Sequence, residues 1–83
     1  MKIDSGIIDF DLDETKDVIE GTIKSDGQLF EVNYAYEQIK FFTINKEYRE
    51  IRSLSLGFDE LSEIIRVAKQ YRDKRYFYLQ NQR

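Results

Sequence analysis

The sequence lacks cysteine, histidine, proline and tryptophan altogether. Without histidine and cysteine, the most common general base, the most reactive nucleophile and the usual zinc ligands are missing, and Ser-His-Asp and Cys-His arrangements are excluded. A chain without cysteine cannot be supported by disulfides, which favours a reducing compartment, so we expect a cytoplasmic protein. Its four glycines are scattered and form no phosphate-binding loop. We therefore predict a protein that is not an enzyme.

Long apolar runs are also missing, since none approaches the roughly 20 residues that cross a membrane. The first residues turn acidic at once and include no apolar stretch of the kind found in signal peptides, so neither a signal sequence nor membrane association is expected. We predict a single domain over residues 1–83. Its core should be thin, because a chain this short buries only about 60–65% of the surface that it exposes when unfolded.

Charge is distributed unevenly along the chain. Residues 1–37 contain ten acidic and three basic side chains, whereas residues 38–83 contain ten basic and six acidic ones. Whether this asymmetry separates charge in space depends on the fold.

Alternating apolar residues predict strands over the first two thirds of the chain, with boundaries near residues 7 and 56. Ile8, Phe10 and Leu12 alternate with aspartates, which places apolar side chains on one face and carboxylates on the other. Further strands are expected over residues 18–24, 29–36, 39–44 and 48–56, where residues also divide between two faces. The segment 39–44 is in addition rich in β-branched and aromatic residues. The pair Asp26-Gly27 predicts a type I′ hairpin turn, and Gly21 predicts a bulge or a close approach.

The apolar period then changes to three and four, which predicts a helix over about residues 58–75. Its apolar stripe is expected to consist of Leu61, Ile64, Ile65, Ala68 and Tyr71. The stripe loses its regularity after Tyr71, so the tail at residues 76–83 either overhangs as helix or forms a short strand. The predicted fold class is α+β: an antiparallel meander of four to five strands with one C-terminal helix packed on one face.

Five carboxylates are expected to share the uncovered face of the sheet: Asp9, Asp11, Asp13, Glu20 and Glu31. Residues 9–20 also place oxygen ligands at the spacing of a calcium-binding loop, but Glu14 and Lys16 occupy positions where that loop needs glycine and an apolar residue. Strand alternation accounts for the aspartates without a metal, so we expect no cofactor. These five residues are the first candidate partner-binding surface, which suits a partner with a basic surface.

The second candidate is a basic, aromatic C-terminal segment: Arg72, Lys74, Arg75, Tyr76, Phe77 and Tyr78. Interleaved aromatic and basic residues are suited to base stacking with phosphate contact, and they also dominate protein–protein hot spots.

Three functions compete on this sequence. The leading hypothesis is a small, acidic protein-interaction module, such as a phage or mobile-element inhibitor of a host nucleic-acid-handling protein. The first alternative is a single-stranded nucleic-acid-binding domain using the C-terminal segment; a strand meander that ends in a helix resembles the layout of such domains, although an isoelectric point near 4.9 disfavours it. The second alternative is a homodimeric structural protein.

Overall fold

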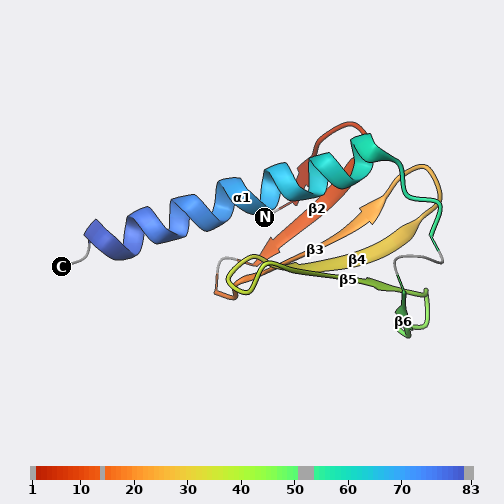
Figure 1. Cartoon of the computed structure of the whole chain (residues 1–83), viewed down its shortest axis with the longest axis horizontal. Helices are drawn as coiled ribbons and strands as arrows, with labels where there is room; N and C mark the ends of the chain where they lie inside the picture. The colour runs from red at the N-terminus through yellow and green to blue at the C-terminus, as the bar shows by residue number, and fades with distance from the viewer. Residues whose placement is uncertain (1, 14, 51–53, 82–83) are drawn as a thin grey trace.

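The computed structural model describes residues 2–13, 15–50 and 54–81, with side chains described up to residue 74. One antiparallel sheet contains six strands in sequence order: β1 (Lys2–Asp4), β2 (Ile8–Asp13), β3 (Val18–Ile23), β4 (Gln28–Asn33), β5 (Gln38–Phe42) and β6 (Tyr48–Arg49). A single helix, α1 (Phe58–Asn81), crosses one face of this sheet (Figure 1). The predicted α+β meander is confirmed, with six strands in place of four or five.

The strands follow a ten-residue period, since β2 to β6 begin at residues 8, 18, 28, 38 and 48. Four-residue connections join β2 to β3, β3 to β4 and β4 to β5. Because these three hairpins have the same length, the register repeats, and a residue of β2 faces fixed partners on β3, β4 and β5. The sheet therefore arranges its side chains in straight rows that run across the strands.

The turn between β3 and β4 differs from the predicted type I′ geometry. Gly27 has a positive φ of 72°, but Asp26 does not, and a type I′ turn needs both. The carbonyl of Ile23 instead accepts a hydrogen bond from Gly27 N–H at 2.8 Å, which closes a four-residue loop. The Asp26 carboxylate accepts a second hydrogen bond from Gln28 N–H at 3.1 Å. This side-chain bond stabilises a longer loop than the sequence pair alone indicated.

The core lies between the sheet and α1. Alternation places Ile8, Phe10 and Leu12 of β2 inward, as predicted, and Phe30 and Val32 of β4 join them. Among the helical side chains that are described, Ile64 and Val67 are the buried ones. The predicted stripe was wrong in part, because Ile65 is 37% exposed and Val67 takes its place. The helix is rotated by part of a turn relative to the periodicity read from the sequence.

The helix is longer than the sheet beneath it. Its 24 residues span about 36 Å, against about 20 Å for a six-residue strand. Figure 1 shows its C-terminal part extending beyond the sheet. Of the two expectations for the tail, the helix is confirmed as far as Asn81, and residues 82–83 lie outside the described part.

The predicted strand over residues 48–56 was wrong in extent. Only Tyr48 and Arg49 pair, with Phe42 and Phe41, and residues 51–53 lie outside the described part. Leu54 and Leu56 instead pack against the core from the connection that leads into the helix. Strand β1 was not predicted from the sequence; its residues Lys2, Ile3 and Asp4 pair with β2.

Candidate functional site

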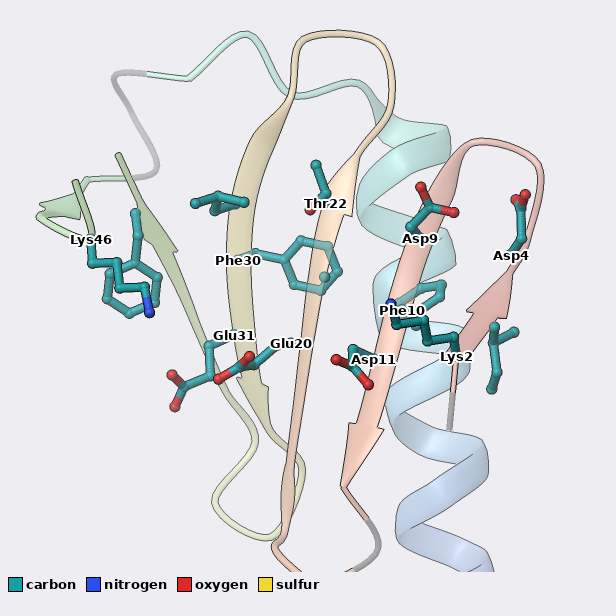
Figure 2. A pocket seen from close by; sticks show the side chains of 14 residues that line it. Lys2, Asp4, Asp9, Phe10, Asp11, Glu20, Thr22, Phe30, Glu31 and Lys46 are labelled. Atoms are coloured by element: carbon teal, nitrogen blue, oxygen red, sulfur yellow. The ribbon is translucent and has the colours of Figure 1, made fainter. Parts of the chain in front are cut away.

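The face of the sheet opposite α1 carries the acidic side chains. Figure 2 looks onto this face, with the helix behind the sheet, and labels one or two carboxylates from each of β1 to β4: Asp4, Asp9, Asp11, Glu20 and Glu31. The surface is hollowed into a shallow depression, floored by the middle of the sheet and approached by Lys46 from the connection between β5 and β6. Asp9, Asp11, Asp13 and Glu20 are exposed, and Glu31 is half-buried.

Three of the predicted carboxylates are brought into one row across the strands. Asp11 of β2 lies opposite Glu20 of β3, and Glu20 lies opposite Glu31 of β4. We call Asp11, Glu20 and Glu31 the acidic row. Directly opposed residues on neighbouring strands have Cβ atoms about 4.5–5.5 Å apart, a distance at which like charges destabilise a sheet. Figure 2 shows the three carboxylates projecting side by side.

Lysines stand at both ends of the acidic row. Lys2 of β1 is the cross-strand neighbour of Asp11, and Lys40 of β5 is that of Glu31. Within the described part of the chain, however, no hydrogen bond or ion pair engages the side chains of the acidic row. Glu20, in the centre, has a carboxylate on either side and faces no cation.

Asp9 is held apart from the acidic row by a different partner. The Lys24 ammonium lies 2.7 Å from the Asp4 carboxylate and 3.8 Å from that of Asp9. Hydrogen bonding from this ammonium lowers the pKa of Asp4, with a smaller contribution from the N–H of Gly6. The same contact raises the pKa of Lys24. Asp9 therefore belongs to an internal ion cluster at one end of the face.

Asp13 is also engaged within the chain. Its carboxylate accepts hydrogen bonds from the hydroxyl and the N–H of Thr15, in the turn that follows β2. These bonds, the hydroxyl's first, lower the pKa of Asp13. Asp13 thus stabilises a turn. Of the five predicted carboxylates, Asp9 and Asp13 have partners within the chain, and the three of the acidic row have none among the described residues.

An apolar area adjoins the acidic row on the same face. Leu29 of β4 pairs with Phe42 of β5, and Phe42 pairs with Tyr48 of β6, whose side chain is 66% exposed. We call Leu29, Phe42 and Tyr48 the apolar corner. The open face therefore combines charge with exposed aromatic surface, and aromatic residues are enriched at protein interfaces.

The C-terminal candidate is described only in part. Arg72 pairs with Glu37 at 2.6 Å and with Asp73 at 3.1 Å, and the Lys74 ammonium lies 5.8 Å from the centroid of the Tyr71 ring. Both cations are thus engaged within the chain. The remaining candidates have helical backbone, but their side chains lie outside the described part: Arg75, Tyr76, Phe77 and Tyr78.

Metal binding and membrane-spanning helices were also considered for the described residues. No group of three or more carboxylates there is close enough to hold a metal ion, and no helix there is both long and apolar enough to span a bilayer. No protein-family model matches the sequence, and neither curated proteins nor solved structures gave a significant match.

Several residues of this face were not predicted from the sequence. Lys2 and Lys40 border the acidic row, and the apolar corner lies beside it. The ten-residue period was the signal that could have revealed most of them. With equal hairpins, residues 11, 20, 31 and 40 must align, so Lys40 could have been placed from strand spacing alone.

Proposed function

We propose that this protein is a small, non-enzymatic interaction module that binds a basic protein partner through its open sheet face. The observation that carries this proposal is the acidic row: three neighbouring carboxylates without an ion pair among the described residues. A fold that only needed solubility could disperse these charges. Here they lie directly opposite one another, where each adjacent pair costs stability.

A basic partner would relieve this repulsion. Lysine or arginine side chains placed over the acidic row would convert a like-charge row into alternating charges. Such complementarity accelerates encounter and excludes partners of the wrong charge. The apolar corner adds a desolvated contact that electrostatics alone does not provide, because tyrosine is one of the residue types enriched among the few that carry most of the binding energy at interfaces. A nucleic-acid-handling protein, which this module would inhibit, is one class of basic partner that this chemistry would suit.

The proposal is tested by affinity capture with variants. We expect wild-type protein to retain a basic partner from bacterial lysate after nuclease treatment, and Glu20→Lys to lose it. The matched control is Glu47→Lys, which makes the same charge change at an exposed residue outside the strands. Circular dichroism and thermal unfolding establish that both variants fold.

Two outcomes contradict the proposal. The same proteins retained by all three forms would show that the acidic row does not bind them. Nucleic acid recovered without a protein partner, and removed by nuclease, would instead favour single-stranded nucleic-acid binding.

A further inference from the structure

The strand β1 forms one edge of the sheet. It is the first strand in the order, and its three residues pair with β2 on one side. Among the described residues, no strand adjoins the outer side of β1. Residues 51–53 follow β6, which lies at the opposite edge, and residue 14 lies between β2 and β3 in the chain. Figure 2 shows β1 as the outermost strand on its side, with α1 behind the sheet.

The outward hydrogen-bonding groups of β1 belong to Lys2 and Asp4. Ser5 N–H donates to the Ile8 carbonyl at 3.0 Å, so the backbone of Ser5 is directed toward β2. Because this direction alternates along a strand, Ile3 is also directed toward β2, whereas Lys2 and Asp4 are directed outward. Each of these two residues therefore offers one N–H and one carbonyl to a further strand.

Two copies of this edge have complementary charges in one register. In an antiparallel pair, residues whose backbones are directed toward the neighbour lie opposite one another. If Ile3 lies on a two-fold axis, Lys2 of each copy lies opposite Asp4 of the other. A shift by two residues in either direction places Lys2 opposite Lys2, or Asp4 opposite Asp4, and like charges in these positions are destabilising. The signs of the two charges thus select the register centred on Ile3.

The charges at this edge are not fully balanced within one chain. The Lys24 ammonium lies 2.7 Å from the Asp4 carboxylate and 3.8 Å from that of Asp9, so this cluster of three groups retains one net negative charge. Lys2 is exposed, and within the described part of the chain no ion pair engages it. Figure 2 shows its side chain over β2, and its flexible stem can turn toward the edge. Lys2 of a second copy would neutralise the cluster.

Ile3 supplies an apolar contact on the helix side of the sheet. Its side chain is half-buried and packs against the core. On the two-fold axis, the two Ile3 residues would form a cross-strand pair of the closer, non-hydrogen-bonded kind, with Cα atoms about 4.5 Å apart. Pairing would therefore bury apolar surface that the single chain leaves exposed, which is favourable.

We propose that this protein forms a symmetric homodimer by antiparallel pairing of two β1 strands, with Ile3 on the axis and two Lys2–Asp4 ion pairs. Each Lys2–Asp4 pair would also exchange two backbone hydrogen bonds, which join the two sheets into one. The axis would be perpendicular to the sheet, so both open faces would lie on the same side. A three-residue edge is short for a stable interface, which buries about 1,200–2,000 Å², so we expect a weak dimer.

Exchanged charges test the register. We expect the wild-type protein to dimerise with a dissociation constant between about 1 μM and 1 mM, measured by sedimentation velocity. Lys2→Asp and Asp4→Lys should each weaken dimerisation at least about tenfold, because each variant alone places like charges opposite one another. An equimolar mixture of the two variants should associate again, since every facing pair then has opposite charges.

The matched control is Lys46→Asp, which makes the same change of charge as Lys2→Asp at an exposed residue outside the strands. It should leave dimerisation unchanged. Circular dichroism establishes that each variant folds.

Hydrogen exchange tests the backbone pairing in the wild-type protein. Exchange of the Asp4 amide should slow at least about threefold between dilute and concentrated protein, because this amide becomes hydrogen-bonded in the dimer. The Ile3 amide is directed toward β2 in either state and should change little. NMR resolves the two amides, and this measurement remains decisive even where a charge variant fails to fold.

Any of four results would overturn the proposal. The first is a wild-type protein that stays monomeric at about 1 mM. The second is a dimer that Lys2→Asp leaves unchanged, which would place the contact on another surface. The third is a mixture of the two folded variants that does not associate. The fourth is dimerisation without slower exchange at Asp4. The β1 edge does not depend on the acidic row, so Glu20→Lys should still dimerise even if the proposed function fails.

Discussion

Gly21 illustrates how a single residue shapes this sheet. It lies between Phe10 and Phe30 in one cross-strand row, and the two rings meet edge to face with centroids 5.8 Å apart. A Cβ at residue 21 would lie 2.3 Å from Cζ of Phe30 and 2.7 Å from the Asp9 carbonyl oxygen. The ring thus occupies the space that the glycine leaves, which confirms the close approach expected from the sequence.

Gly21→Ala should therefore destabilise the protein by about 1–3 kcal/mol, the usual cost of overpacking a core. Urea unfolding measures this change. The control is the same substitution in a Phe30→Leu background, where the ring is absent and the added cost should be smaller. Equal costs in the two backgrounds would show that the ring is not responsible.

At the scale of elements, the start of α1 is fixed by one carboxylate. Glu60 accepts a hydrogen bond from Gly57 N–H at 2.9 Å, which satisfies an otherwise unpaired donor at the helix terminus. Its other oxygen accepts a bond from the Ser25 hydroxyl at 3.0 Å, in the turn between β3 and β4. Glu60 therefore caps the helix and also ties it to the sheet.

Glu60→Ala should cost about 1 kcal/mol of stability, the typical cost of losing a helix cap. Glu63→Ala is a suitable comparison, because it removes an ion pair with Arg66 within the same helix. Ion pairs between helical residues three or four apart contribute about 0.2–0.5 kcal/mol. Chemical denaturation compares the two variants. An equal or larger loss in Glu63→Ala would contradict the role given to Glu60.

For the molecule as a whole, the register of the meander sets the charge on each face. Acidic residues distant in sequence become neighbours because the hairpins have equal lengths, whereas the basic residues of α1 lie on the other side of the sheet. The charge asymmetry along the chain is thus partly an asymmetry in space. Lys2, Lys24, Lys40 and Lys46 moderate it on the open face.

Glu20→Gln should raise stability by about 0.2–1 kcal/mol, because it removes the charge between two other carboxylates. The gain should shrink as salt is added, since exposed charges are screened. Thermal unfolding at low and high salt, with Glu47→Gln as the control, measures both effects. A loss of stability at low salt would mean that Glu20 is stabilised by a cation, and the acidic row would lose its significance.

Local patterns in the sequence determined much of this fold. Alternation of Ile8, Phe10 and Leu12 with aspartates defined a strand and its two faces, because side chains on a strand alternate regardless of what surrounds them. The change of period near residue 58 defined the helix for a similar reason. Strand alternation also predicted five acidic residues on one face, and the structure places them there.

Only the tertiary structure decided which of those residues could act together. Asp9 and Asp13 are engaged by Lys24 and Thr15, and neither pairing is encoded in strand alternation. The rotation that exposes Ile65 and the two-residue length of β6 likewise depend on how the helix and the final strand dock. Sequence periodicity specifies which face a side chain occupies, whereas its partners depend on register and packing between distant segments.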